Sequence, residues 1–171
     1  MIELCRQLQE SGVPFSAMIV GRADADTARA IRETIETSGL AERIALHDWM
    51  DGDTLRRTLQ ESDVLVHLSL LDSFPLIVLE AQIAGVTAIV ADMAGTSNMV
   101  RSYGGFVAPG GDVAAAAHWL LKQKATSMRQ SANDAASKVR HDYAWDVVAR
   151  NVARIAEQTL PNAIQPSGPV C

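Results

Sequence analysis

The sequence has few aromatic residues and no excess of positive charge. Aromatic residues make up 5% of the 171 residues, which argues against a binding surface built chiefly on stacked rings. The 15 lysine and arginine residues are outnumbered by 20 aspartate and glutamate residues, so the net charge is -5. A chain with this charge does not broadly attract a phosphate polymer or an anionic membrane, and we expect no nucleic-acid partner.

Cysteines and long hydrophobic runs are also scarce. Cys5 and Cys171 lie at opposite ends of the chain and show neither a metal-ligand spacing nor a disulfide framework, which suits a reducing compartment. The most apolar stretch, 75–91, is interrupted by Glu80 and Gln82 and is too short to span a membrane, and no secretory signal is visible. We therefore expect a cytoplasmic protein, or one held at the cytoplasmic face of the membrane through a lobe outside this chain.

Several catalytic and metal-binding patterns are missing as well. None of the four histidines has a cysteine or carboxylate at helical spacing that suggests a metal site, so we expect no metal ion and no cofactor. No Gly-x-Gly-x-x-Gly follows a predicted strand and no Gly-x-Ser-x-Gly occurs, which disfavours a classical dinucleotide oxidoreductase and a serine hydrolase.

The hydrophobic pattern alternates between β-branched runs and helical periods, which predicts an α/β fold. The runs 17–20, 64–66 and 88–90 are apolar on both faces, as expected of central strands, so we expect a Rossmann-like parallel sheet of about five strands with helices on both faces and a helical C-terminal segment. The expected strands are Phe15–Val20, Arg43–His47, Val64–Leu68, Thr87–Ala91 and Gly105–Ala108, and the expected helices are Met1–Gln9, Asp26–Ser38, Asp53–Glu61, Pro75–Ala84, Val113–Gln123, Ser127–Arg140 and Trp145–Leu160.

The domain organisation follows from the two ends of this pattern. The helix Met1–Gln9 runs straight into the first strand, although a parallel sheet of this kind normally begins with a strand. We predict one domain over residues 1–160 that lacks its first strand. Pro166, Gly168 and Pro169 predict a disordered tail over residues 161–171.

The stretch 69–85 carries most of the chemistry. It follows a central strand and enters a helix whose first turn holds Pro75, with Asp72 or Ser73 as the expected capping side chain. Backbone N–H groups at a helix N-terminus attract anions. Glu80 follows Asp72 by two helical turns, up to roughly 12 Å, which suits a diphosphate-linked ligand with a hydroxyl-bearing ring near each acid.

Simpler interpretations exist for both acids. Asp72 can serve only as a helix cap. Glu80 lies between Leu79 and Ala81 in a helix that we expect to be largely covered, where a carboxylate needs a partner, so a structural salt bridge is the alternative.

The same stretch resembles the donor-binding, C-terminal half of the family 4 retaining glycosyltransferases, which have the GT-B fold. The family's signature separates an acid from a Glu-Ala pair by seven intervening residues, around a Gly-Phe-Gly or Gly-Phe-Pro core, with a glycine further on. The corresponding residues here are Asp72-Ser73-Phe74-Pro75, Glu80-Ala81 and Gly85. Further segments resemble the family in order along the chain: 19–21, 40–44, 62–64, 91–95, 103–112 and 143–145.

The resemblance implies a role for each matching residue. Glu80 would bind the ribose hydroxyls of a UDP or GDP sugar, and Asp72 would be the catalytic residue that contacts the donor sugar. Backbone groups around Ser73, Phe74 and Leu76 would hold the phosphates. The nucleotide pocket would be shaped by Gly21, Arg22, Asp48, Trp49 and Met50. For Trp49 the alternative is packing at a strand end, and for Arg22 a solvated loop position.

The sequence also departs from the family pattern. Asp72 replaces the commoner glutamate, Asn98 stands where the family usually has glutamate, and Ala94 replaces a glycine. The implied function is transfer of a hexose-type sugar to an acceptor, which is a glycan, a lipid or a small molecule, with the acceptor lobe absent from this chain. The alternatives are a nucleotide-sugar epimerase of the same architecture and a non-catalytic binding or assembly module. An exposed sheet edge near the first strand would favour self-association.

Overall fold

The computed structural model describes residues 1–92 and 95–159. The predicted tail, 161–171, lies outside the described residues, as do Met93 and Ala94 of the 91–95 turn. The elements follow the chain in the order α1 (Ile2–Glu10), β1 (Ala17–Val20), α2 (Ala25–Thr37), β2 (Ile44–His47), α3 (Gly52–Glu61), β3 (Val64–His67), α4 (Leu76–Ile83), β4 (Thr87–Ala91), α5 (Ser97–Tyr103), β5 (Phe106–Ala108), the short 3-10 helix η1 (Pro109–Gly111), α6 (Val113–Leu121), α7 (Ala125–Asp142) and α8 (Trp145–Thr159).

The structure confirms the parallel α/β fold, and every predicted strand forms. The predicted helices form as well, whereas α5 is an element that the sequence does not predict. Its sequence, Ser-Asn-Met-Val-Arg-Ser-Tyr, contains two serines and an asparagine, which favour caps and turns over helix interiors. Met99 and Val100 of this helix are buried in a cluster with residues of α4 and β4, so tertiary packing outweighs the weak local preference for a helix.

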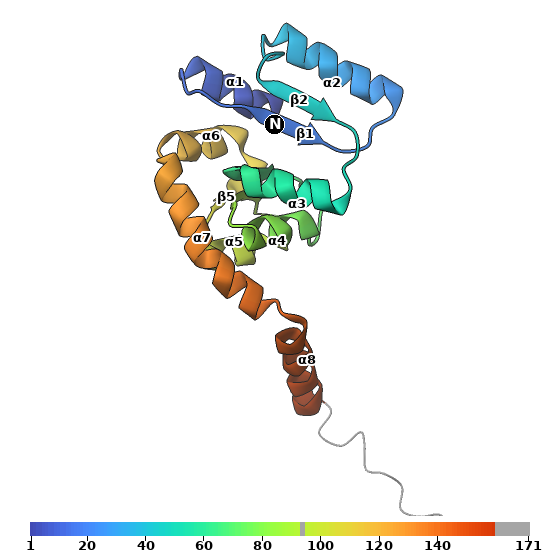
Figure 1. Ribbon diagram of the computed structural model, residues 1–171, viewed down its shortest axis with the longest axis vertical. Coiled ribbons are helices and arrows are strands. Elements are labelled where there is room, and N and C mark those ends of the chain that lie inside the picture. The colour runs from blue at the N-terminus through green and yellow to red at the C-terminus, as the bar shows by residue number, and fades with distance from the viewer. Residues whose placement is uncertain (93–94, 160–171) are drawn as a thin grey trace, which may run out of the picture.

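The strands pair in two groups (Figure 1). β1 pairs with β2, while β4 lies between β3 and β5, and all these pairs are parallel. Within the described residues β1 and β3 each hydrogen-bond to one neighbouring strand only, which leaves one edge of each strand unpaired. Unpaired edges expose backbone N–H and C=O groups that can accept another strand.

Helix α1 connects the cores of the two sheets. Leu4 and Leu8 pack in the cluster that includes Ile89 and Ala108 of the three-stranded sheet, together with α6. Cys5, from the same helix, packs instead against Ile44 of β2 and against α2. The burial of these three side chains within one nine-residue helix therefore stabilises both sheets at once.

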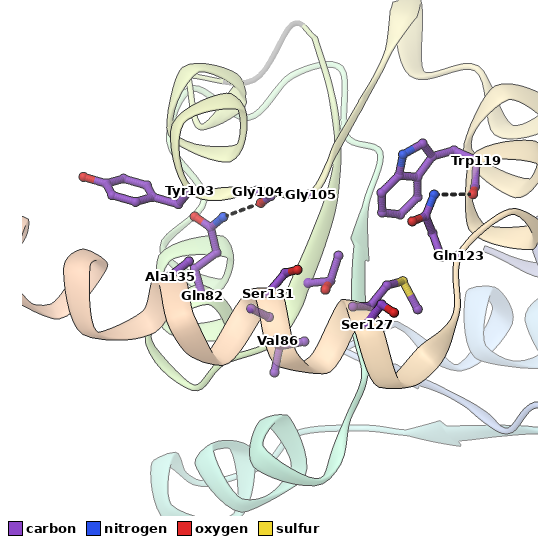
Figure 2. Close-up of a pocket in the computed structure, with 13 residues that line it drawn as sticks. Gln82, Val86, Tyr103, Gly104, Gly105, Trp119, Gln123, Ser127, Ser131 and Ala135 are labelled. Atoms are coloured by element: carbon purple, nitrogen blue, oxygen red, sulfur yellow. Dashed lines mark hydrogen bonds between the residues drawn. The ribbon is translucent and has the colours of Figure 1, made fainter.

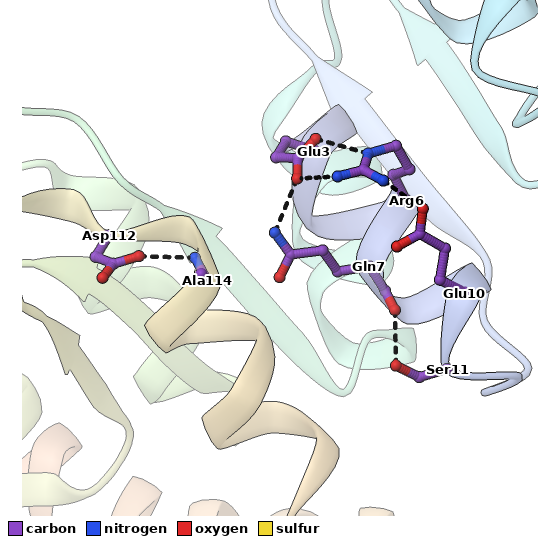
Figure 3. Close-up of polar contacts among 7 residues, drawn as sticks. All are labelled: Glu3, Arg6, Gln7, Glu10, Ser11, Asp112 and Ala114. Carbon is purple, nitrogen blue, oxygen red and sulfur yellow. Dashed lines mark hydrogen bonds and ion pairs between the residues drawn. The ribbon is translucent and has the colours of Figure 1, made fainter.

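The opposite face of α1 is polar (Figure 3). Arg6 forms ion pairs with both Glu3 and Glu10, and Gln7 donates a 2.8 Å hydrogen bond to Glu3. The hydrogen bond from Arg6 is the main reason that the pKa of Glu3 falls to about 2. Such solvent-exposed pairs contribute little stability individually, so α1 is held mainly by its apolar face.

Helices cover both faces of the three-stranded sheet. Leu4 and Leu8 of α1, together with α6, pack on the face that carries Val64, Val66 and Ile89. Helices α4 and α5 pack on the other face, against Leu65, Ala88 and Val90, and α3 packs beside α4. As predicted for a central strand, β4 is buried along its whole length.

The same prediction is wrong for β1. Met18 and Val20 are about 40% exposed, while their neighbours Ala17 and Ile19 pack in the core with α1 and α2. The reason is that α1 and α2 both pack against the face of β1 that carries Ala17 and Ile19. The other face, which carries Met18 and Val20, is left exposed. An apolar run alone could not distinguish one covered face from two.

Helix α8 extends away from the body of the molecule at the end of α7 (Figure 1). Trp145, Val152 and Ile155 are 86%, 61% and 55% exposed, and no described residue of α8 is buried. These three residues recur at heptad-like spacing, so α8 presents an apolar stripe to solvent.

Candidate functional site

The candidate site begins at the loop between β3 and α4. The structure starts α4 at Leu76 with Pro75 as the N-cap residue, and no side chain caps the helix. The prediction that Asp72 or Ser73 caps it is therefore wrong, because both residues precede the cap position and lie too early to serve as the N-cap. Within residues 1–92 and 95–159, the backbone N–H of Val78 donates to the carbonyl oxygen of Pro75, whereas the N–H groups of Leu76 and Ile77 have neither a hydrogen-bond partner nor a side-chain cap, which is the arrangement that binds anions.

Glu80 lies on the same helix and is exposed to solvent. The interpretation that Glu80 is a covered carboxylate with a structural ion pair is wrong: α4 buries Val78, Ala81 and Gln82, and within residues 1–92 and 95–159 Glu80 forms no ion pair. Val78 and Ala81 face the neighbouring helices and strands, so Glu80 points elsewhere. Its carboxylate is available to a ligand.

Asp72 lies in the loop and is partly exposed. Its Oδ2 atom lies 3.5 Å from Nε2 of His67, the last residue of β3. The sequence placed His67 at the end of a central strand but gave no signal that it contacts Asp72, because the contact depends on how the loop 68–75 folds back. Of the other predicted residues, Ser73 and Phe74 in this loop and Leu76 at the start of α4 are exposed.

Loops at the carboxyl ends of the strands are fastened to one another. Asp92, directly after β4, accepts a 2.9 Å hydrogen bond from the backbone N–H of Gly110 in η1. Leu70 lies against Gly111, at which a Cβ atom would come within 3.0 Å of the Leu70 side chain. These contacts hold the loops after β3, β4 and β5 together at the carboxyl end of the sheet, which is where parallel α/β proteins bind ligands.

A second group of predicted residues lies at the carboxyl ends of β1 and β2. The backbone N–H of Gly21 donates a 3.1 Å hydrogen bond to the carbonyl oxygen of His47. The guanidinium of Arg22 lies 5.5 Å from the centre of the Trp49 ring, which is 63% exposed. This cation–π contact brings together two residues that the sequence predicted for the nucleotide pocket without indicating that they touch.

The other two residues of this group differ in environment. Asp48 is exposed, whereas Met50 is half-buried and its sulfur accepts a 3.7 Å hydrogen bond from Thr58 of α3. Met50 therefore packs on α3 and contributes less open surface than Asp48 or Trp49.

A cavity lies away from both groups (Figure 2). It has a volume of about 240 Å³ and sits between α4, α6 and α7, at the amino ends of β4 and β5. The side chain of Gln82 lines it and donates a 3.0 Å hydrogen bond to the carbonyl oxygen of Gly104. This cavity is at the end of the sheet opposite to the predicted site residues.

In the part of the chain that the structure describes, no three histidine, cysteine, aspartate or glutamate side chains gather as a metal site would require. Of the helices seen in residues 1–92 and 95–159, none has the length and apolar character needed to cross a membrane.

Comparisons with known proteins point to one family. Residues 1–139 match the model of the family described as glycosyl transferases group 1. The chain is 25% identical over 171 residues to WcaL of Escherichia coli (strain K12), a protein named for a glycosyltransferase role in colanic acid biosynthesis. The match covers 91% of this chain and 40% of WcaL, so the chain spans about two fifths of that relative.

Solved structures with the same fold show the same partial coverage. Sucrose-phosphate synthase (tll1590) from Thermosynechococcus elongatus superposes with a TM-score of 0.73 at 18% identity, over 94% of this chain and 42% of that protein. Anabaena Alr3699/HepE, solved in complex with UDP-glucose, superposes with a TM-score of 0.69 at 20% identity, over 94% of this chain and 44% of that protein. This chain thus has the fold of one half of a GT-B glycosyltransferase.

Proposed function

Because the chain belongs to the glycosyl transferases group 1 family, we propose that it forms the nucleotide-sugar-binding part of a retaining enzyme that transfers a hexose-type sugar. The observation that carries the proposal is the uncapped start of α4, which lies between Asp72 and the exposed Glu80. An anion-binding helix start flanked by two available carboxylates matches a sugar joined to a nucleoside by a diphosphate.

In this proposal each group binds a different part of the donor. Backbone N–H groups near Ser73, Phe74 and Leu76 hold the diphosphate and stabilise the charge that develops as it leaves. Glu80 accepts hydrogen bonds from the ribose hydroxyls. Asp72, the proposed catalytic residue, accepts them from the sugar and orients it. The bond from the anomeric carbon to the diphosphate oxygen breaks, a bond from that carbon to an acceptor oxygen forms, and the leaving diphosphate takes up the proton that the acceptor hydroxyl loses.

The Arg22 and Trp49 pair supports a nucleotide base and phosphate at the ends of β1 and β2. The indole ring offers an exposed face and the guanidinium offers a positive charge beside it. Gly21 and Asp48 complete this surface. Of the two donors considered, we propose UDP over GDP, since Alr3699/HepE of the same fold was solved with UDP and with UDP-glucose.

The acceptor, in the proposal, binds a lobe that this chain does not contain. The chain spans less than half of the relatives that it matches, so we propose that it binds donor but does not transfer sugar by itself. We also propose that the complete enzyme works in the cytoplasm and needs no metal. A nucleotide-sugar epimerase and a non-catalytic module remain the alternatives.

Calorimetry of the 171-residue chain with UDP and with UDP-glucose tests the proposal. We expect saturable binding of both, and no sugar transfer to glycan or lipid acceptors when the donor is supplied. Absence of UDP binding by the folded chain would contradict a donor-binding role. Robust transfer by the chain alone would contradict the half-enzyme role.

A further inference from the structure

His67 approaches Asp72 from the buried side of the site. Its Nε2 atom is inaccessible to solvent, lies 3.5 Å from Asp72 Oδ2 and makes no hydrogen bond within residues 1–92 and 95–159. The Asp72 side chain is 41% exposed, against 24% for His67. Oδ2 thus lies beside the buried Nε2 atom, while the carboxylate side chain as a whole remains partly open to a ligand.

The two residues differ in how firmly the fold holds them. His67 is the last residue of β3, where it pairs with Val90 of the buried strand β4. Asp72 belongs to the irregular segment 68–75, which forms neither helix nor strand. The histidine is thus the fixed partner and the carboxylate the adjustable one.

A small movement of this segment would complete a hydrogen bond. A normal N–H···O bond spans about 2.7–3.2 Å, so a shift of roughly half an ångström is enough. Buried polar atoms without a partner are unfavourable, and Asp72 Oδ2 is an acceptor within reach of Nε2.

We propose that His67 positions Asp72 for the donor sugar by donating its Nε2–H to Oδ2, which leaves Oδ1 to accept a hydrogen bond from a sugar hydroxyl. The inference rests on the proposed function. It assigns no contact between His67 and the donor, so His67 acts through Asp72 as a positioning residue. Its loss should weaken recognition of the sugar and leave recognition of the nucleotide unchanged.

Calorimetry with UDP and UDP-glucose on three variants tests this. His67→Leu removes the donor group, His67→Gln keeps an N–H donor near the position of Nε2, and His118→Leu changes an exposed histidine on α6 as the control. We expect His67→Leu to bind UDP-glucose about tenfold more weakly, as for loss of a hydrogen bond to a charged group, with UDP affinity unchanged. His67→Gln should recover most of the affinity, and the control should match the unaltered chain.

Equal losses for UDP and UDP-glucose in His67→Leu, or no recovery in His67→Gln, would overturn the inference in favour of a structural role. Failure of the unaltered chain to bind either compound would overturn the proposed function and this inference with it. Nitrogen NMR of the His67 ring gives a readout that needs no ligand and no change at residue 67. If the His67 ring signal is identical in the unaltered chain and in Asp72→Asn, the proposed hydrogen bond is wrong. If the His67 signal changes and the signals of the other histidines do not, the hydrogen bond is supported.

Discussion

The backbone N–H of Gly95 donates a 2.7 Å hydrogen bond to the carbonyl oxygen of Ser73. The bond joins the turn after β4 to the segment that leads into α4. The approach is so close that a Cβ atom on Gly95 would lie 1.9 Å from that oxygen. A residue without a side chain is therefore required at position 95 to hold the proposed phosphate-binding segment in place.

Replacing Gly95 with alanine should displace the segment around Ser73. The new methyl group collides with backbone, which cannot move aside as a flexible side chain can, so we expect about 1–3 kcal/mol lower stability and weaker UDP binding. Chemical denaturation and calorimetry measure the two effects. Gly52→Ala is the matched control, because a Cβ atom there meets nothing within 4 Å. Unchanged UDP binding by Gly95→Ala would show that the Ser73 segment does not contact the nucleotide.

Replacing Glu80 with glutamine should weaken UDP binding by about 1.5–3 kcal/mol, the range for a hydrogen bond to a charged group. The exchange keeps the shape of the side chain and removes the charge that would accept from ribose hydroxyls. Calorimetry compares it with Glu157→Gln, an exposed glutamate on α8. Equal affinity of Glu80→Gln and the unaltered chain, with both well folded, would remove Glu80 from the site.

The two tyrosines of the chain should titrate at unusually high pH. Burial raises the pKa of both Tyr103 and Tyr143, and the 2.6 Å hydrogen bond that Tyr103 donates to Asp142 raises its pKa further. The folded state then holds these protons more tightly than the unfolded state does. Their contribution to stability is fully present below pH 10, the ordinary tyrosine pKa, and is lost as the pH rises above it.

Ultraviolet absorbance of phenolate measures this directly. We expect the folded chain to ionise its tyrosines at higher pH than the chain unfolded in guanidinium, and Tyr103→Phe to remove the component with the larger shift. Coincident titration curves for the folded and unfolded chain would contradict the burial of Tyr103 and Tyr143.

The unpaired edges of β1 and β3 should make the isolated chain self-associate. Sedimentation across a concentration series should show a mass that rises with concentration. Val20→Lys, which places a charge on the exposed face of β1, should reduce association. Val152→Glu, on the apolar stripe of α8, should leave association unchanged if the strand edges cause it. A monomer at high concentration would contradict the prediction. If only Val152→Glu reduced association, the apolar stripe of α8 would be its cause and the strand edges would not.

Local sequence patterns determined the order and type of most elements. Apolar runs with β-branched residues mark all five strands, and Gly39 and Gly85 follow α2 and α4 with positive φ values of 68° and 81°, the left-handed conformation in which a glycine closes a helix. The ordered motifs from Gly21 to Trp145 likewise indicated the family, because a motif is read from neighbouring residues. The sequence also selected Asp72 and Glu80 as residues of interest.

The tertiary structure decided what surrounds those residues. Glu80 is exposed because α4 turns Val78, Ala81 and Gln82 toward its neighbours, and the side chain of Asp72 lies near His67 because the segment 68–75 folds back onto the end of β3. The tertiary structure likewise decided which strands pair and whether a given strand is covered on one face or on both, as the exposed Met18 and Val20 of β1 show. The physical reason is that periodicity reports how apolar a face is, whereas exposure and contact depend on which distant segments pack against it.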